Sequence, residues 1–227
     1  MDRALVVGAS RGIGLALAAE LLARGWHVLA TERERSPGLD RLAADAGDRL
    51  ERAHVTLGDR ASERAFVAGL GDRRFDVVVL NAGIFGPRHQ SLDVARAELA
   101  ELIDVNALAP VRLAHRLLPR LATPDGVLAF MTSRLGSVTE NRSGGMDLYR
   151  LSKAGLNMLT RSLAAGNEVR GITILSLHPG WVRTTMGGEA APLEPAASAR
   201  GLARVLAEAR GRGGHHFLDF EGQPIPW

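Results

Sequence analysis

The sequence predicts a doubly wound α/β fold: a parallel sheet of about seven strands with helices on both faces. The first observation is that short apolar runs alternate with longer segments of helical spacing along the whole chain. The second is that these runs are apolar throughout, as expected for strands buried on both faces. The third is a glycine-rich turn that follows the first run and opens the first helix. Strands that are joined through helices run parallel, so the alternation specifies this fold class.

Seven runs have the length and composition of buried strands. They are Ala4 to Val7, His27 to Ala30, Val55 to Leu57, Val77 to Leu80, Val127 to Met131, Ile172 to Leu177 and His216 to Phe220. Helical spacing is found between them, over Gly12 to Arg24, Glu63 to Leu70, Leu92 to Leu121, Leu148 to Val169 and Ala196 to Ala209. The segment from Met186 to Pro195 is rich in Gly and Pro, so we expect a mobile loop where a substrate lid would sit.

Composition limits the class of protein further. The chain has 227 residues, of which 46% are hydrophobic and 23% charged, and no linker or repeat divides it, so residues 1–227 are expected to form a single domain. The net charge is only +3, and basic residues are interspersed with acidic ones, which does not indicate a nucleic-acid surface.

Two further absences in the sequence set its expected environment. Without Cys the chain has no disulfide, thiol nucleophile or thiolate metal site, which is compatible with a reducing cytosol. The first strand begins almost at Met1 and no apolar run has transmembrane length, so neither a signal peptide nor a membrane span fits. We expect a soluble, cytoplasmic protein.

The turn after the first strand is built around three glycines and reads Gly8-Ala9-Ser10-Arg11-Gly12-Ile13-Gly14. Glycine allows the backbone to turn tightly, to approach a pyrophosphate and to pack helix against strand. The helix N-terminus then presents unpaired N–H groups and its positive dipole end to phosphate. A glycine string alone fits an ordinary strand-to-helix turn, but this position in the chain favours dinucleotide binding.

Tyr149 is the only tyrosine, and Lys153 is the only lysine among 28 basic residues. Four residues apart on a predicted helix, they lie on one face. An ammonium on a flexible stem can sit close beneath a phenol, whereas a planar guanidinium cannot. A cation there favours the phenolate, so we expect Lys153 to lower the pKa of Tyr149 toward the range of a general acid or base. A bare Tyr-x-x-x-Lys string also occurs by accident on helix surfaces, so the context has to decide.

Further motifs follow the later strands: Asn81-Ala82-Gly83 after the fourth, Asn106 in the next helix, Ser133 after the fifth and Pro179-Gly180 after the sixth. Together with the glycine turn and the Tyr149 and Lys153 pair, they resemble the short-chain dehydrogenases/reductases over essentially the whole chain. The stretches His178 to Thr184 and Phe217 to Gly222 are similar to the subgroup of C-factor-like proteins and sniffer-type carbonyl reductases. The resemblance implies a Rossmann fold with one dinucleotide-binding and catalytic domain.

The resemblance also implies roles for single residues. Tyr149 would exchange a proton with the substrate oxygen, and Lys153 would lower its pKa and bond the nicotinamide ribose. Ser133 would hydrogen-bond the substrate, and Asn106 would hold a water for proton relay. The cofactor contacts that the resemblance implies, besides Tyr149 and Lys153, are Gly8, Ser10, Arg11, Gly12, Ile13, Gly14, Thr31, Arg33, Thr56, Leu57, Asn81, Ala82, Gly83, Pro179, Gly180, Val182 and Thr184. Taken singly, a serine that ends a strand or a threonine that caps a segment would explain such residues equally well.

The sequence departs from the family pattern beside the expected site. The stretch Glu140 to Gly145 lengthens the connection between Ser133 and Tyr149, and such a loop can contact substrate. Many relatives carry an Asp after the third strand to hold the adenine amine, where this chain has Thr56 and Leu57. Adenine recognition is therefore expected to depend more on backbone groups.

The end of the second strand, Thr31-Glu32-Arg33, bears on the choice of cofactor. A 2′-phosphate needs cations, and Arg11 and Arg33 can offer guanidinium forks to it. We therefore predict NADP(H). NAD(H) stays possible, because Glu32 would repel the phosphate and accept ribose hydroxyls if its side chain turned inward.

The predicted function is NADPH-dependent carbonyl reduction, reversible as alcohol oxidation, on a small-molecule carbonyl or alcohol. Apolar lining of the substrate pocket is expected from Leu135, Met146, Trp181, Val182 and Met186. Two alternatives stay open: a dinucleotide-binding regulator of C-factor type with little catalysis, and a scaffold domain that binds no nucleotide. The resemblance further implies a homodimer or homotetramer, formed through the helices that hold Asn106 and Tyr149. The leucines of those helices that would contribute, or that would instead cover the sheet, are Leu99, Leu102, Leu117, Leu156, Leu159 and Leu163.

Two other chemistries are not supported by the sequence. No metal is predicted, because His54, His89 and His115 lack partners at ligand spacing and the adjacent His215 and His216 point to opposite faces of a strand. Ser133 is not a hydrolase nucleophile, because no Gly-x-Ser-x-Gly elbow surrounds it.

Overall fold

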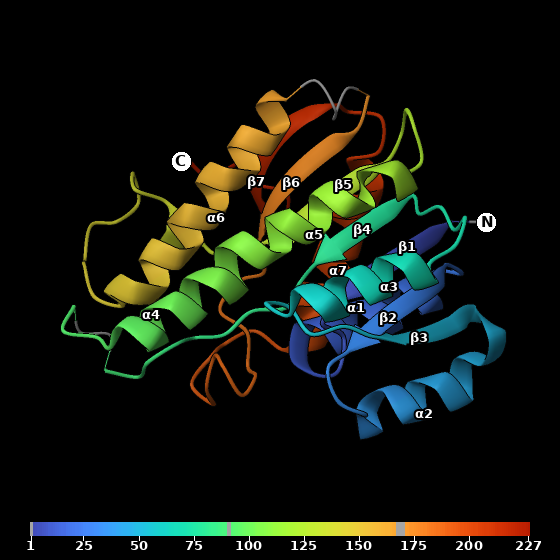
Figure 1. Cartoon of the computed structure of the whole chain (residues 1–227), viewed down its shortest axis with the longest axis horizontal. Coiled ribbons are helices and arrows are strands. Elements are labelled where there is room, and N and C mark those ends of the chain that lie inside the picture. The colour runs from blue at the N-terminus through green and yellow to red at the C-terminus, as the bar shows by residue number, and fades with distance from the viewer. Residues whose placement is uncertain (1, 90–91, 167–170) are drawn as a thin grey trace.

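Seven parallel strands form one sheet in the order β3-β2-β1-β4-β5-β6-β7 (Figure 1). The structure is a computed structural model and describes residues 2–89, 92–166 and 171–227. The strands are β1 (Arg3–Val7), β2 (His27–Glu32), β3 (Leu50–His54), β4 (Val77–Leu80), β5 (Val127–Met131), β6 (Thr173–His178) and β7 (Gly214–Asp219). The predicted doubly wound parallel sheet is confirmed, and six of the seven predicted strands overlap the observed ones.

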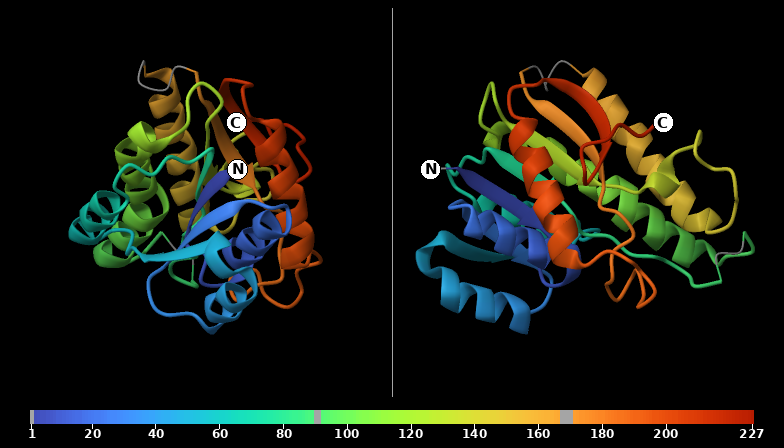
Figure 2. Two further views of the ribbon diagram at one scale, coloured as in Figure 1. Left: turned by 90° about the vertical axis from the view of Figure 1, so that its right-hand side faces the viewer. Right: turned by 180° about the vertical axis from the view of Figure 1, so that it is seen from behind.

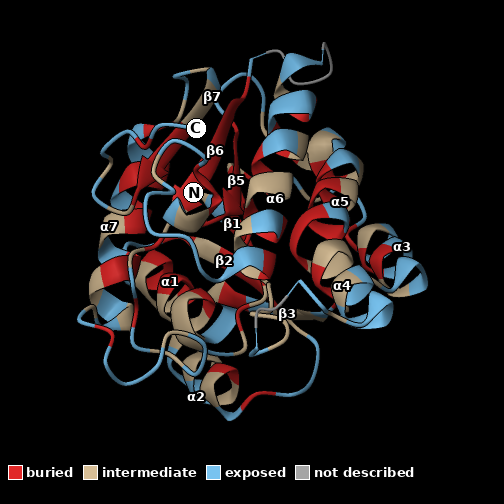
Figure 3. Ribbon diagram, turned by 90° about the vertical axis from the view of Figure 1, so that its left-hand side faces the viewer, coloured by how far each residue is buried: buried red, intermediate tan, exposed pale blue. Residues whose placement is uncertain are grey.

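Helices cover both faces of this sheet, as the three directions of view in Figures 1 and 2 show. On one face α1 (Gly12–Ala23), α2 (Pro37–Ala46) and α7 (Pro195–Glu208) share an apolar core with the sheet. On the other face α3 (Arg60–Gly69), α5 (Ala109–Leu117) and α6 (Asp147–Ala165) do the same. Buried residues are concentrated in the strands and on the inward sides of the helices (Figure 3), as a two-sided core requires.

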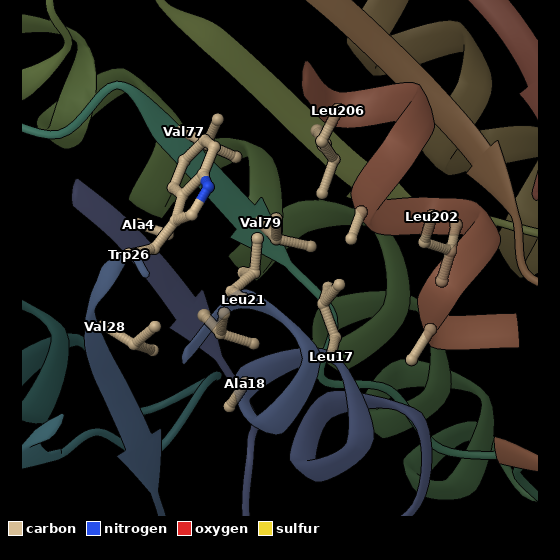
Figure 4. Close-up of a cluster of buried hydrophobic side chains, with 14 of the residues drawn as sticks. Ala4, Leu17, Ala18, Leu21, Trp26, Val28, Val77, Val79, Leu202 and Leu206 are labelled. Atoms are coloured by element: carbon tan, nitrogen blue, oxygen red, sulfur yellow. The ribbon is translucent and has the colours of Figure 1, made fainter. Parts of the chain in front are cut away.

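The core of the first face is built on α1. Its Leu17 and Leu21 lie between Val79 of β4 and the α7 residues Leu202 and Leu206 (Figure 4), and all five are fully buried. Removing such a leucine to Ala costs about 2–5 kcal/mol of folding free energy. This packing fixes the start of α1, and with it the glycine turn, against the end of β1.

The third strand is the element that the sequence prediction misplaced. The apolar run Val55 to Leu57 was predicted to be a strand, but β3 is Leu50–His54 and ends before it. β3 pairs only with β2 at the edge of the sheet, so it carries exposed and half-buried polar residues that no buried-strand pattern contains. Thr56 and Leu57 therefore lie just beyond the strand end.

Two helical regions also differ from the prediction. α2 was missed, although Ser36 caps its start and Pro37 occupies its first turn, both of which are helix-start signals. The helix predicted from Leu92 begins at Arg96 as α4 (Arg96–Ile103) and passes through a π-helical turn, η2 (Asp104–Leu108), into α5. The helix predicted to end at Val169 is α6, which ends at Ala165, and Val169 itself lies outside the described residues.

The strand order reverses between β1 and β4. The chain leaves β1 for α1 on one face, whereas it leaves β4 for α4 and α5 on the other. In open α/β sheets, ligands bind at the carboxyl ends of the strands at such a switch point. The motif residues Gly8 to Gly14 and Asn81 to Gly83 follow these two strands and so meet there.

The edge strand β7 is partly covered by the C-terminal segment of the same chain. The segment Gln223 to Trp227 returns antiparallel along β7, with the Ile225 N–H donating to the Phe217 carbonyl at 2.9 Å. The Trp227 ring packs on Phe217, with the centroids 5.2 Å apart. The Trp227 carbonyl accepts a hydrogen bond from the N–H of Thr139 at 3.1 Å. This segment thereby fastens the loop after β5 to the last strand.

Candidate active site

The glycine turn is packed so closely that side chains do not fit. Gly8 has φ +87°, and a Cβ on it would lie 2.6 Å from the Cβ of Ala82. A Cβ on Gly14 would lie 2.1 Å from the Gly8 carbonyl oxygen, and the Asn81 amide donates to that same oxygen at 2.7 Å. The backbones of the turn after β1 and the segment after β4 therefore lie so close together that only glycine fits at positions 8 and 14.

Thr31 supports this turn from the end of β2. It is fully buried, its hydroxyl accepts a hydrogen bond from the Gly8 N–H at 3.1 Å, and its carbonyl accepts one from Ala9. The resemblance implies a cofactor contact for Thr31, whereas the structure turns its hydroxyl toward the backbone of the turn. Its contribution in the structure is to position the loop.

The start of α1 is open to an anion. Within the described chain no side chain caps this end, and the first turn has no acidic residue. Gly12 has φ +57°, and a Cβ on it would come within 3.3 Å of the Thr184 methyl group. The loop after β6 thus approaches the glycine turn closely, so that a side chain on Gly12 would press on Thr184.

The loop after β6 is closed by its own hydrogen bonds. The buried Val182 pairs with Leu193, the Trp181 indole donates to the Gly187 carbonyl at 2.8 Å, and the Thr184 hydroxyl accepts from the Gly187 N–H. Gly180 has φ +88°, and a Cβ on it would lie 2.7 Å from Leu193. Pro179 anchors the loop, because its carbonyl accepts the Ser198 hydroxyl at 2.6 Å. The predicted lid segment is thus part of a loop held by internal hydrogen bonds, and its mobility stays a prediction.

Asn106 sits inside the π-helical turn η2 and is fully buried. Its side chain forms two hydrogen bonds with the backbone of Ile84, at 2.8 and 2.7 Å, and donates to Ser152 at 3.0 Å. A Cβ on Gly83 would meet both the Asn106 amide oxygen and the Lys153 ammonium, at 3.1 and 3.4 Å. π-Helical turns are frequent at functional sites, and this one joins the segment after β4 to α6.

Ser133, Tyr149 and Lys153 lie where β5 meets α6. The buried Lys153 ammonium donates to the Met131 carbonyl at 3.0 Å and lies 5.7 Å from the centre of the Tyr149 ring. The Ser133 hydroxyl accepts from the Leu135 N–H at 3.1 Å. A Cβ on Gly136 would clash with Lys153 at 2.8 Å. The turn that carries Ser133 is therefore pressed against α6 at the level of Lys153.

Sequence reasoning missed Phe85. Its ring stacks on Tyr149 with centroids 5.3 Å apart and planes inclined by 26°. The available signal was an aromatic residue two positions after Asn81-Ala82-Gly83 in a chain with only 4% aromatic residues. This contact holds the phenol ring over Lys153.

The two titrating groups have pKa values different from those expected from the sequence. Burial raises the pKa of Tyr149 to about 12 and lowers the pKa of Lys153 to about 8. The expectation that Lys153 lowers the pKa of Tyr149 is wrong for the protein alone, because loss of hydration outweighs a cation that also donates to a carbonyl. Tyr149 is therefore a neutral phenol at physiological pH, in the state that donates a proton.

The predicted contacts to adenine and to the 2′ position lie at the ends of β2 and β3. The N–H of Thr56 donates to the Ser62 hydroxyl at 2.9 Å, and Leu57 follows it. Arg33 and Arg11 are exposed. Glu32 instead turns toward Arg52, with its side chain only 11% exposed. The residues present thus fit a dinucleotide: a glycine cradle, an uncapped helix start and exposed guanidinium groups surround the switch point.

Comparison with known proteins agrees with this geometry. The family profile described as short chain dehydrogenase matches residues 2–194. The chain is 39% identical to the C-signal of Myxococcus xanthus over 72% of this chain and 99% of that protein. It is 43% identical to a carbonyl reductase from Pseudomonas aeruginosa PAO1 in complex with NADP, with a TM-score of 0.93 and full coverage of both chains. The carbonyl reductase Sniffer of D. melanogaster is 30% identical over both full lengths, with a TM-score of 0.91.

The chain belongs to the short-chain dehydrogenase family. It is an oxidoreductase of the class that interconverts alcohols and carbonyl groups, and its relatives include C-factor-like proteins and sniffer-type carbonyl reductases. The family predicted from the motifs is thereby confirmed.

The described residues contain neither a candidate metal site nor a candidate membrane-spanning helix. Among them no group of three or more His, Asp or Glu side chains is placed to hold a metal ion. In the same part of the chain, no helix is long and apolar enough to cross a membrane.

Proposed function

We propose that the protein is an NADPH-dependent carbonyl reductase in which Tyr149 donates the proton. The observation that carries the proposal is the neutral phenol, stacked on Phe85 above the buried Lys153 and next to the glycine cradle. Such a group suits carbonyl reduction, because the acid must hold its proton until the carbonyl oxygen becomes negative. Residues 1–227 would act as one cofactor-binding and catalytic unit.

Each catalytic side chain has a task in this proposal. The bound nicotinamide supplies the hydride to the carbonyl carbon. Tyr149 transfers its hydroxyl proton to the carbonyl oxygen, so that the C=O bond becomes CH–OH. The Ser133 oxygen accepts the Leu135 N–H, which leaves its own proton free to be donated to the same substrate oxygen. Lys153 stabilises the phenolate that Tyr149 becomes, and Asn106 fixes the Ile84 backbone beside it.

The preference for NADPH is supported by the exposed arginines. The side chain of Arg33 is 70% exposed, and its ion pair with Glu34, also exposed, is long at 3.6 Å. Such a pair contributes little, so Arg33 can exchange it for a phosphate. The NADP in the complex with the Pseudomonas aeruginosa carbonyl reductase supports the same preference. Arg33→Ala is expected to raise the Kd for NADPH about tenfold or more and to leave the Kd for NADH unchanged. Equal effects on both cofactors would contradict the role.

The substrate is proposed to be an apolar aldehyde, ketone or quinone. Met146, Trp181 and Met186 expose 47%, 58% and 47% of their surfaces around the site, and buried charge is confined to Lys153 among the catalytic side chains. The test begins with a fluorescence titration of the purified protein with NADPH and NADH. It continues with NADPH consumption against a panel of such carbonyl compounds. Absence of NADPH binding would overturn the proposal.

The similarity to the C-signal favours a second candidate, a dinucleotide-binding regulator with little catalysis. The same titration separates the two candidates. Tight NADPH binding with turnover supports the reductase, whereas tight binding without turnover on any carbonyl of the panel supports the regulator.

We further propose that the protein forms a homodimer or homotetramer. Leu102 is buried, and Leu117, Leu156 and Leu163 are buried in the core between the helices and the sheet. The apolar residues that α6 and the adjoining η2 leave exposed are Leu108, Leu151 and Met158, at 45%, 51% and 67%. A monomer in sedimentation velocity at working concentration would refute this assembly.

A further inference from the structure

The carboxylate at the end of β2 is bound on both of its oxygens. One oxygen of Glu32 accepts hydrogen bonds from the Arg52 guanidinium, the Nε contact being 3.0 Å. The other accepts the Ser36 N–H at 2.8 Å. Arg52 reaches it from β3, where it is registered opposite Ala30. The acidic side chain that would decide between NAD(H) and NADP(H) is thus held by a residue of the neighbouring strand.

Arg52 also joins Glu32 to a second carboxylate. Its Nη1 donates to Asp40 at 2.5 Å, and Arg35 donates to Asp40 at 3.1 Å. The cluster therefore contains the two carboxylates of Glu32 and Asp40 and the two guanidinium groups of Arg35 and Arg52, with a formal charge of zero. The side chains of Glu32 and Arg52 are only 11% and 24% exposed, so this pair is less screened by solvent than a surface pair.

The same cluster is connected to the cofactor turn. The Ser36 hydroxyl donates to the Ser10 carbonyl at 2.5 Å, while the Ser36 N–H binds Glu32. Ser10 belongs to the glycine turn. Ser36 therefore connects the Glu32 carboxylate to this turn through two hydrogen bonds. A free charge on Glu32 would act directly on a ligand group at the end of β2.

The structure assigns a specificity-determining role to Arg52. We propose that Arg52 neutralises and holds Glu32, so that the end of β2 receives the 2′-phosphate of NADPH rather than the ribose diol of NADH. This inference rests on the proposed NADPH dependence and adds to it the residue that makes an acidic strand end compatible with a phosphate.

The test compares cofactor affinities in Arg52→Met, which keeps most of the length but removes the charge. We expect the Kd for NADPH to rise about tenfold, because a like charge then faces the phosphate, and the Kd for NADH to stay equal or to fall. Arg73→Met is the matched control, because Arg73 pairs with Glu51, the β3 neighbour of Arg52, at 2.9 Å. The control should leave the ratio of the two affinities unchanged. An unchanged ratio in Arg52→Met would overturn the inference.

A double variant separates charge neutralisation from direct phosphate binding by Arg52. If Arg52 acts through Glu32, then Arg52→Met in a Glu32→Gln background should change the ratio of the two Kd values less than threefold. This limit is roughly the deviation from additivity found for independent substitutions. A full tenfold shift in that background would overturn the role assigned to Glu32. Arg52→Gln serves as a second variant if the Met variant does not fold, as judged by circular dichroism.

The two proposals fail in distinguishable ways. Tighter binding of NADH than of NADPH by the unaltered protein would refute the proposed cofactor preference. The inference about Arg52 is refuted instead by a ratio that does not respond to its replacement. Both are read from binding titrations and need no turnover.

Discussion

The two sides of the site are built differently. On the cofactor side, the backbone segments after β1 and β4 approach so closely that Gly8 and Gly14 have no room for a Cβ. On the side that we propose to receive the substrate, the exposed side chains stand on loops and include Met146 and Trp181, which are about half exposed. The difference teaches that the cofactor side is fixed by backbone geometry, whereas the substrate side is free to vary. Substitutions should therefore separate the two functions.

The largest effect is expected from Tyr149→Phe. Removing the acid should lower kcat about 10²- to 10⁴-fold, the usual contribution of general acid catalysis. The stack on Phe85 survives, because the ring is kept, so the Kd for NADPH should stay unchanged. Stopped-flow reduction of a carbonyl substrate and a cofactor titration check the two halves of this prediction. Retained turnover would show that another group donates the proton.

Gly12→Asp should abolish cofactor binding instead. Its φ of +57° strains any residue with a side chain, the Thr184 methyl at 3.3 Å would have to shift, and a carboxylate at the start of α1 repels phosphate. We expect the Kd for NADPH to rise at least ~100-fold. Gly25→Asp is the matched control, because Gly25 also has positive φ, +84°, but no heavy atom within 4 Å of its added Cβ. Similar losses in both variants would indicate a folding defect rather than a blocked cradle.

The pH dependence of reduction is expected to come from Lys153. Its pKa is lowered to about 8 while that of Tyr149 is raised to about 12. Below pH 8 the ammonium is present and the rate should be constant. Above pH 8 the cation is lost while Tyr149 is still protonated, so kcat/KM should fall by about tenfold per pH unit. The profile of Lys153→Met should lack this transition, and a transition that persists would assign it to another group.

The smallest effect is expected on the substrate side. Trp181→Ala removes one hydrogen bond, to the Gly187 carbonyl, and part of an exposed apolar surface. The hydrogen bond lies within the protein, so its loss affects the loop after β6. Loss of apolar contact with the substrate, about 1 kcal/mol, should raise KM for an apolar carbonyl about fivefold. The Kd for NADPH should not change, and a matching loss of cofactor affinity would show that the two sides are not independent.

The sequence predicts the fold and the geometry of the glycine turn well, because both depend on local signals. Glycines at fixed spacing and an apolar strand alternation report directly on the backbone geometry that they require. The family pattern likewise placed Asn106, Ser133, Tyr149 and Lys153 near one another, although their roles stay predictions. The pKa of Tyr149 could not be predicted, because spacing on a helix says nothing of the burial that opposes its ionisation.

Contacts between residues far apart in the chain also could not be predicted from the sequence. Glu32 and Arg52 are 20 residues apart, and the contact exists only because β2 and β3 are neighbours in a particular register. The position of β3 itself was predicted wrongly, so the pairing could not have been derived. The sequence therefore predicted NADP(H) but left NAD(H) possible, because the direction of the Glu32 side chain was unknown.

The two edges of the sheet differ in how they avoid joining other strands. The C-terminal part of the last strand is covered by Gln223 to Trp227 of its own chain, so the edge backbone groups of Phe217 and Asp219 are already paired. β3 is the strand at the other edge of the sheet. Its exposed Glu51 and half-buried Arg52 place charged side chains along the edge that has no neighbouring strand. Charged side chains on an edge strand discourage aggregation through edge-to-edge pairing. The polar composition of β3, which prevented its prediction as a buried strand, thus also disfavours strand pairing between separate molecules.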